Sequence, residues 1–131
     1  MSLALVVDLA RDQEWVASFV NLGRTRSGGS HVLGLCSGAV KGVRRWLRAD
    51  APARVRERAR GVHARHLRRS MAGAISIIHD QAQFEGATRS RLSDVEVAQR
   101  LRTELSEPFH AYLAEHPDLA EAWVRRAAGA G

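Results

Sequence analysis

A long amphipathic segment, residues 31–49, constrains the fold of this chain more than any other stretch. Its apolar side chains recur at spacings of three and four residues, which places them on one face of an α-helix. These positions are Val32, Cys36, Ala39, Val40, Val43, Trp46 and Leu47. Ser30 stands where an N-cap residue is favoured, after a glycine-containing loop over 23–30. Lys41 and three arginines lie off the apolar face.

Three apolar, β-branched stretches flank this helix. Residues 3–10 and 14–22 predict two strands, and the short link between them, residues 11–13, predicts a hairpin. Residues 53–69 are strongly basic and compatible with a helix after the break at Pro52. Residues 71–79 predict a third strand. The predicted order up to this point is two strands, a helix, a helix-compatible basic stretch and a third strand.

The last third of the chain predicts a loop followed by two helices. Residues 80–92 read as the loop, and Ser93 with Glu96 forms a capping box for the helix that follows. Leucine and other apolar residues then recur every fourth position, and Pro108 is expected to kink this helix. Pro117 fits the first turn of a final helix, where its missing N–H is not needed.

Length and composition predict one domain in a reducing compartment. With 131 residues, of which 45% are hydrophobic and 26% charged, the chain can bury a modest core. No apolar run is long enough to cross a membrane, and no basic leader precedes the first strand, so we expect a cytoplasmic location. The lone Cys36 excludes an internal disulfide and a multi-cysteine zinc site. Its place on the apolar stripe predicts a buried thiol.

The charge of the chain favours a polyanionic partner. The net charge is +6, and between Lys41 and Arg69 there are eleven Lys or Arg residues against two acids. A solvated surface is the ordinary explanation, but this excess favours sequence-independent contacts with DNA phosphates. The one Trp, Tyr or Phe residue in this stretch is Trp46, which lies on the apolar face of the predicted helix. No aromatic side chains therefore interleave with the cations for base stacking, which argues against single-strand binding. The candidates for DNA-backbone contact are Lys41, Arg44, Arg45, Arg48, Arg54, Arg58 and Arg65.

The histidines do not form a catalytic or metal-binding pattern. Only His63 and His66 have a close spacing, and two ligands fall short of a zinc site. His31 lies in the first turn of the predicted helix without a nucleophile and third partner, so a structural role is expected. Gly28 and Gly29 before it could leave amides open to an anion, but two glycines alone are weak evidence, and a simple helix start is the favoured explanation.

Several motifs, in order and spacing, resemble one family. Residues 18–21 (SFVN) and 26–35 (RSGGSHVLGL) are similar to the SFVN and GGTHxxGF motifs of bacterial type IIA topoisomerase B subunits, gyrase B and topoisomerase IV B. Residues 75–77 and 83–92 (QFEGATRSRL) resemble the family's VSV and FEGQTKxKL motifs. Residues 114–120 (AEHPDLA) resemble its ENPxxA stretch. The likeness covers nearly the whole chain.

The matched region of that family is the transducer domain of GHKL ATPases. The resemblance implies an α+β fold, a small mixed β-sheet backed by helices with a left-handed βαβ crossover. It also implies one domain over residues 1–131, which we expect to be a piece of a longer subunit. That domain couples ATP binding and hydrolysis to closure of the DNA gate and to strand passage.

The resemblance also implies a nucleotide-facing loop. Where the family has Gln-Thr-Lys, this chain has Ala87, Thr88 and Arg89. The family's lysine touches the terminal phosphate of ATP, so Arg89 would be the phosphate sensor and Thr88 its loop partner. An arginine keeps the charge and can hold a phosphate through two N–H groups. Cys36 replaces an arginine of the family motif, and residues 68–71 replace its REGL.

The partners expected from this resemblance are double-stranded DNA, an adjacent ATP-binding domain, the topoisomerase A subunit and a second copy in a dimeric parent. The motifs of the ATP-binding domain and of the cleavage domain are absent from these residues, so the chain alone is expected to be non-catalytic. Mg-ATP would be held mainly by a domain outside it. The alternative is a stand-alone module that keeps the fold and binds DNA or protein without ATP. A basic adaptor without a topoisomerase link is a third and weaker alternative.

Overall fold

The computed structural model describes residues 2–7, 13–21, 23–25, 29–77, 84–85, 91–92 and 95–130. The strands are β1 (Ser2–Val7), β2 (Trp15–Val20), β3 (Gly23–Arg24), β4 (Met71–Ile77), β5 (Phe84–Glu85) and β6 (Arg91–Leu92). The helices are α1 (Ser30–Ala49), α2 (Ala53–Arg58), α3 (Ala64–Arg68), α4 (Val95–Glu115) and α5 (Pro117–Ala130). No helix among these residues is long and apolar enough to cross a membrane.

The main sheet has the order β1-β4-β2-β3, so β4 lies between the first two strands of the chain. β1 runs antiparallel to β4, with Ser2 opposite Ser76, and β2 runs parallel to β4, with Trp15 opposite Ala72. The predicted hairpin between the first two strands is therefore wrong. A short link favours a hairpin locally, but here β4 takes the place between the two strands and bonds to both. β2 instead pairs antiparallel with β3, and Asn21, directly after β2, has a φ of 50°.

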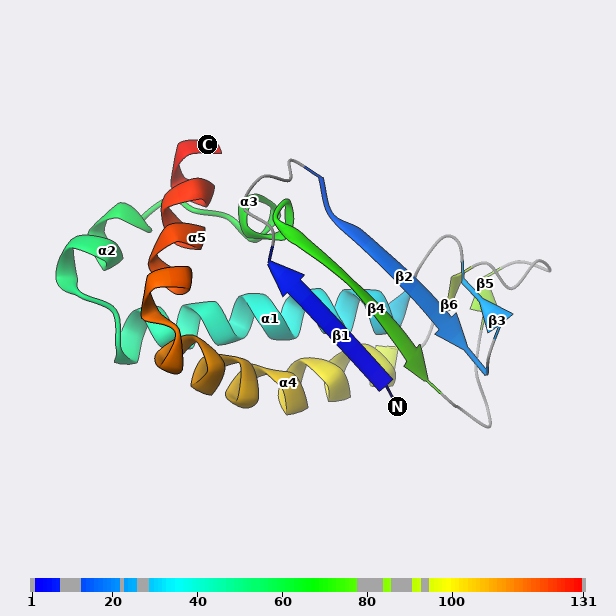
Figure 1. The fold of residues 1–131 in the computed structure, drawn as a ribbon. Helices are drawn as coiled ribbons and strands as arrows, with labels where there is room; N and C mark the ends of the chain where they lie inside the picture. The colour runs from blue at the N-terminus through cyan, green and yellow to red at the C-terminus, as the bar shows by residue number, and fades with distance from the viewer. Residues whose placement is uncertain are drawn as a thin grey trace.

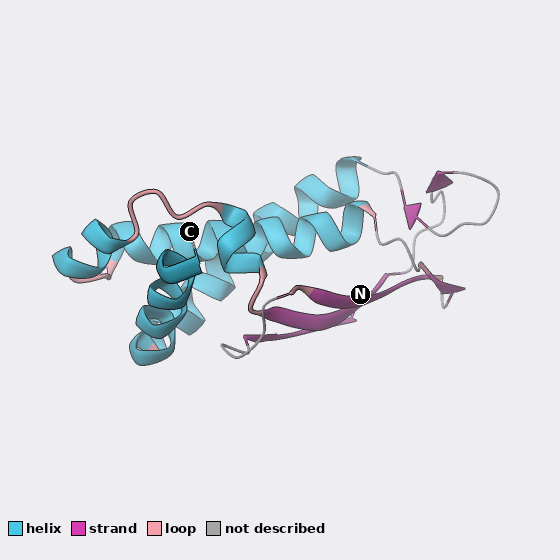
Figure 2. Ribbon diagram, turned by 90° about the horizontal axis from the view of Figure 1, so that it is seen from above, coloured by secondary structure: helices cyan, strands magenta, loops and turns pink. Residues whose placement is uncertain are grey.

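The helices lie on one face of the sheet (Figure 2). The chain leaves β2, passes through α1 behind the sheet and returns to the parallel strand β4 (Figure 1). This crossover is left-handed, against the strong general preference for right-handed ones. The α+β fold class with a mixed sheet and this crossover is confirmed.

α1 and α4 pack closely along a stripe of glycines. Gly34, Gly38 and Gly42 recur every fourth residue and form one stripe of α1. A Cβ added to Gly34 would lie 2.8 Å from the Leu101 Cβ and 2.9 Å from the backbone oxygen of Ala98. At Gly38 and Gly42 the nearest α4 atom would be 3.0 Å away. The apolar spacing used to predict α1 does not include these glycines, so their stripe was not predicted.

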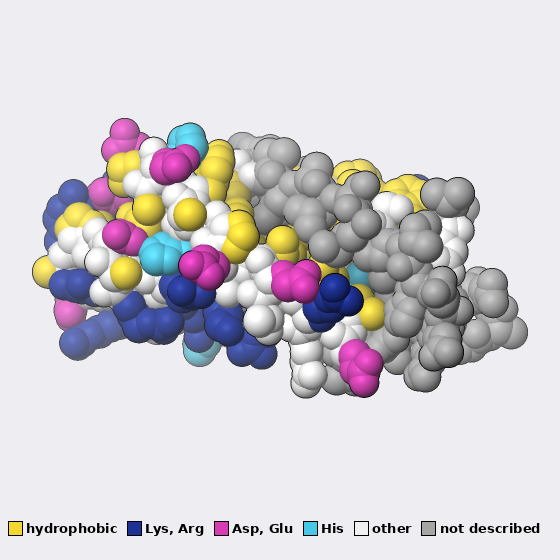
Figure 3. All heavy atoms as spheres, turned by 90° about the horizontal axis from the view of Figure 1, so that it is seen from below, with side chains coloured by type: hydrophobic (Ala, Val, Ile, Leu, Met, Phe, Trp, Pro, Cys, Tyr) yellow, Lys and Arg dark blue, Asp and Glu magenta, His cyan; other side chains and the backbone are white. Residues whose placement is uncertain are grey.

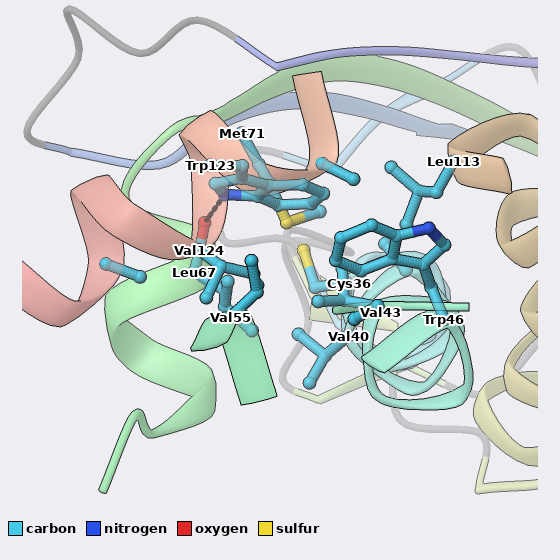
Figure 4. Packing of buried hydrophobic residues seen from close by; sticks show 14 residues of the cluster. Cys36, Val40, Val43, Trp46, Val55, Leu67, Met71, Leu113, Trp123 and Val124 are labelled. Carbon is cyan, nitrogen blue, oxygen red and sulfur yellow. Dashed lines mark hydrogen bonds between the residues drawn. The ribbon is translucent and has the colours of Figure 1, made fainter. Parts of the chain in front are cut away.

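The main core lies where α1, α5 and the beginning of β4 meet (Figure 4). Trp46, Trp123 and Met71 are at most 2% exposed and pack with Leu113 of α4. The Trp123 Nε1–H donates to the Leu67 carbonyl at 3.0 Å, which ties α5 to α3. A second cluster between sheet and helices contains Val20, Leu35, Ile75 and Leu101. The expected burial of Trp46 and Cys36 is confirmed.

Helix boundaries follow the sequence in part. α5 begins at Pro117, as predicted, and α4 continues through Pro108 as one helix. Ser30 is the first helical residue rather than the cap, because Gly29 precedes it at φ 131° and no side chain caps the helix. The basic stretch 53–69 divides into α2 and α3 around Gly61, whose φ is 79°. Ser93 of the predicted capping box lies outside the described residues.

Candidate functional site

The two regions that the sequence singles out belong to opposite ends of the molecule. At one end lie β3, the β5–β6 pair and the beginning of α1 (Figure 1). β5 and β6 run antiparallel, with Phe84 opposite Leu92, and β6 lies against α1. The predicted loop over 80–92 is thus partly a two-stranded ladder that brackets residues 86–90. Thr88 and Arg89 themselves lie outside the described residues.

A buried hydrogen-bond chain fixes the beginning of α1 to the sheet at this end. The Ser18 Oγ donates to the Thr25 carbonyl at 2.8 Å and lies 2.6 Å from the Thr25 Oγ1. The Thr25 Oγ1 lies 3.1 Å from the His31 Nε2. Each hydroxyl has one proton, so Thr25 donates to Ser18 and accepts from His31 Nε2–H. The His31 Nδ1 then carries a buried lone pair that has no hydrogen-bond partner among the described residues. The structural role expected for His31 agrees with this geometry.

Protonation of His31 is expected to weaken the fold. Burial lowers the pKa of His31 from 6.5 to about 4. Between these values the unfolded chain binds a proton that the folded chain excludes. Stability is therefore complete above pH 6.5 and falls by up to about 3 kcal/mol as the pH drops to 4. Urea unfolding at pH 7 and pH 5 should show about 2 kcal/mol of this loss.

His31→Gln removes the titrating group and should flatten the wild-type decline between pH 6.5 and 5. His116→Gln is the matched control, because His116 is exposed between α4 and α5. The control should keep the wild-type decline. A His31→Gln variant that declines as steeply as wild type would show that another group causes the pH dependence.

The opposite end carries the basic side chains. Lys41, Arg44, Arg45 and Arg48 of α1 recur at three and four, which makes one stripe, here called the α1 basic stripe. Arg44 and Arg48 are exposed, while Lys41 and Arg45 are half-buried. Cationic side chains gather along one edge at the helical end of the molecule (Figure 3). Within the part of the chain that the structure describes, none of the four forms an ion pair.

The other three DNA candidates lie on the short helices. Arg54 and Arg58 are exposed on α2, four residues apart on one face, and Arg65 is exposed on α3. Arg54 donates to Glu121 of α5 at 2.5 and 3.4 Å, so its charge is partly compensated. Arg58 and Arg65 make no ion pair with any described residue. All seven candidates thus lie in the helical half of the fold.

Cys36 is buried beside an ion pair between Glu14 and Arg68. Arg68 donates to the two Glu14 oxygens at 2.6 and 3.1 Å, which joins α3 to the residue before β2. Burial, and secondarily the Glu14 carboxylate, raise the pKa of Cys36 to about 12. The thiol is therefore protonated at neutral pH and unsuited to nucleophilic chemistry.

The ring centroids of His63 and His66 lie 5.5 Å apart at the beginning of α3. The His66 Nδ1 accepts the backbone N–H of His63 at 3.2 Å, so this nitrogen is already engaged. Among the described residues no group of three or more His, Cys, Asp or Glu could hold a metal ion.

Two residues that the sequence analysis missed lie against the basic surface. Glu121 and Arg125 are one turn apart on α5 and pair with each other. Glu121 also pairs with Arg54 across 67 positions of sequence. Their i, i+4 spacing is visible in the sequence, but their approach to α2 depends on how α5 packs. The sequence also shows the glycines of α1 at every fourth position. This spacing is typical of a helix that packs closely against another helix.

Comparison with known sequences shows the family to which this chain belongs. The sequence profile of DNA gyrase B matches residues 2–130. The DNA gyrase B protein of Streptococcus pyogenes is 28% identical over 114 residues, which are 87% of this chain and 17% of that protein. The chain therefore spans about a sixth of the length of this relative.

Solved structures share the fold. The topoisomerase IV ATP-binding domain of Francisella tularensis matches with a TM-score of 0.83 and 22% identity, covering 97% of this chain and 34% of that one. The ATPase and transducer domains of DNA topoisomerase II from Balamuthia mandrillaris match with a TM-score of 0.59 and 22% identity. That match covers 89% of this chain and 32% of the other. Both likenesses span a minor part of the solved chain.

Proposed function

Because the chain belongs to the DNA gyrase B family, we propose that it is the transducer domain of a gyrase B or topoisomerase IV B subunit. Residues 1–131 would form the second domain of the ATPase half of this subunit. The domain couples ATP binding and hydrolysis to closure of the DNA gate and to strand passage. The likeness to a solved chain that contains ATPase and transducer domains supports the proposal.

The observation that carries this proposal is the path of α1. The helix begins beside the β5–β6 pair and ends at the basic side chains. Its 20 residues span about 30 Å at 1.5 Å per residue. The glycine stripe holds α1 against α4 with backbone atoms in close contact, so the two helices move together. A displacement at the loop end is then carried to the basic end.

The loop that connects β5 and β6 is the proposed nucleotide sensor. Arg89 would hold the terminal phosphate of ATP, with Thr88 beside it in the loop. A cation at this phosphate loses a strong charge-assisted contact when the phosphate leaves, which makes the loop a two-state reporter. Mg-ATP itself would be bound mainly by the adjacent ATP-binding domain, outside this chain. That domain, not this one, would supply the hydrolytic chemistry.

The α1 basic stripe is the proposed contact with double-stranded DNA. Lysines and arginines on a rigid helix neutralise phosphates without reading sequence. Such a surface fits the wall of a compartment through which a duplex passes. The parent would act in the cytoplasm as a dimer, together with a topoisomerase A subunit.

Removing positive charges from the α1 basic stripe should lower the affinity for DNA and make this affinity less dependent on salt. Each phosphate contact contributes about 0.9 to the log–log salt slope, or roughly eightfold in affinity at 0.1 M salt. Arg44→Gln with Arg48→Gln should flatten the slope for a short duplex by about 1.8. Fluorescence anisotropy of a labelled 20-bp duplex across a salt series measures it.

The matched control removes the same charge elsewhere. Arg56 and Arg102 are exposed on α2 and α4, outside the seven DNA candidates. Arg56→Gln with Arg102→Gln should leave the slope closer to wild type than the stripe variant does. Equal salt slopes for the two double variants would show that the α1 basic stripe contributes only through the total positive charge of the protein.

A stand-alone module that binds DNA without ATP is the second candidate function. The presence of Ala87 and Arg89 where the family motif has Gln and Lys favours this alternative. The reading frame around the segment distinguishes the two, because a transducer requires an ATP-binding domain encoded before it.

A further inference from the structure

A charged pocket opens between α2 and α5, next to the α1 basic stripe. Its volume is about 350 Å³. It is lined by Arg54, Val55, Arg58, Glu121, Val124 and Arg125. Val55 and Val124 are at most 4% exposed and form an apolar floor, while the charged side chains form the rim. A neighbouring hollow of about 240 Å³ shares Val124 and includes Arg44 of the stripe.

The pocket holds more positive than negative charge. Three arginines face one carboxylate, so the net charge of its lining is +2. Glu121 lies between Arg54, at 2.5 Å, and Arg125, at 3.3 Å. Hydrogen bonding from Arg54, and further from Arg125, lowers the pKa of Glu121, so the carboxylate is ionised at neutral pH. Arg58 has no ion-pair partner among the described residues, and a guanidinium offers five N–H donors.

Glu121 shows which chemistry this rim accepts. Its two carboxylate oxygens lie within reach of Arg54 guanidinium nitrogens, and one of them also lies near Arg125. A phosphodiester offers the same single negative charge on two oxygens, the arrangement that arginine binds best. The apolar floor suits the carbon face of the adjoining deoxyribose. The shared Val124 places this pocket next to the hollow that Arg44 of α1 lines.

We propose that the α2–α5 pocket binds a phosphate of the DNA backbone, with Glu121 as an internal anion that the phosphate displaces. The bound phosphate bridges Arg54 and Arg58 of α2 to Arg125 of α5, in place of the present ion pair. The pocket extends the track of the α1 basic stripe. This inference rests on the DNA contact proposed above and adds Arg125 and Glu121 to it.

Opposite changes in the pocket should move DNA binding in opposite directions. Arg58→Gln with Arg125→Gln removes two donors and should flatten the salt slope for a labelled 20-bp duplex by up to about 1.8. Glu121→Gln removes the competing anion and should bind the duplex up to about eightfold more tightly at 0.1 M salt. If DNA binding depended only on the total charge of the protein, these substitutions would change it in the same directions. A control substitution at another position on α2 is therefore needed.

Arg56→Gln is the positional control. Arg56 is exposed on the same helix but two residues from Arg54 and Arg58, about 200° around α2, and does not line the pocket. Arg58→Gln alone should lower the affinity for the duplex more than Arg56→Gln does. Thermal unfolding of every variant confirms that each is folded under the binding conditions.

The outcomes separate this inference from the proposal on which it rests. If Arg44→Gln with Arg48→Gln weakens duplex binding while the pocket variants match Arg56→Gln, the pocket inference fails and the DNA contact of α1 stands. If none of these variants changes duplex binding, both fail. Titration with inorganic phosphate, followed by ³¹P NMR, distinguishes the source of the anion. Pocket variants that alter phosphate binding but not duplex binding would overturn the assignment to DNA.

Discussion

Gly34→Val is expected to destabilise the folded chain by about 3 kcal/mol, at the upper end of the usual cost of overpacking. The first added carbon would lie 2.8 Å from the Leu101 Cβ and 2.9 Å from the Ala98 carbonyl oxygen. Two of the three nearest atoms belong to the α4 backbone, which cannot rotate away as a side chain can. α1 and α4 must separate, and the contacts along both helices are then lost. Urea unfolding followed by circular dichroism measures the change.

Gly129→Ala is the control for this substitution. Gly129 lies in α5, and nothing lies within 4 Å of an added Cβ. Alanine is favoured over glycine in a helix by up to about 1 kcal/mol, so this variant should be as stable as wild type or slightly more so. Gly34→Ala gains the same propensity and still should lose stability. If Gly34→Ala were stabilising, α1 and α4 would not be in the close contact described.

Arg89→Ala in the intact subunit is expected to reduce ATP turnover at least about tenfold, a modest share of what a charged phosphate clamp supplies. Alanine removes the cation that the proposal assigns to the terminal phosphate. Arg89→Lys keeps the charge and should retain more activity, although it loses bidentate geometry. Steady-state ATP hydrolysis measures both variants.

Arg100→Ala serves as the comparison for the loop variant. Arg100 is exposed on α4 and pairs with Glu104 at 3.0 Å on its own helix. Its loss should leave ATP turnover near wild type. If Arg89→Ala hydrolysed ATP at the wild-type rate, Arg89 would not be the phosphate sensor.

Local patterns in the sequence predicted the helices well. The apolar spacing of α1 and the proline at the beginning of α5 act within a few residues, and tertiary packing did not override them. The burial of Trp46 and Cys36 follows from the same spacing. The sheet was different, because β4 pairs with β1 across more than 60 residues. A short link between two strands says nothing about a third strand that inserts between them.

The candidate site shows the same difference between local patterns, which the sequence predicts, and long-range packing, which it does not. The seven DNA candidates could be found from charge density alone, and all seven lie at the helical end. Glu121 and Arg125 could not, since their role depends on α5 meeting α2. Thr88 and Arg89 rest on the family resemblance and stay a prediction, because they lie outside the described residues.

One end of this domain is proposed to respond to nucleotide and the other to DNA. ATP hydrolysis by the intact parent protein, measured with and without linear duplex DNA, tests this coupling most directly. We predict that DNA raises the turnover and that the increase disappears with added salt, in parallel with duplex binding by the chain. A turnover that is the same with and without DNA, under conditions where the duplex is bound, would contradict the coupling.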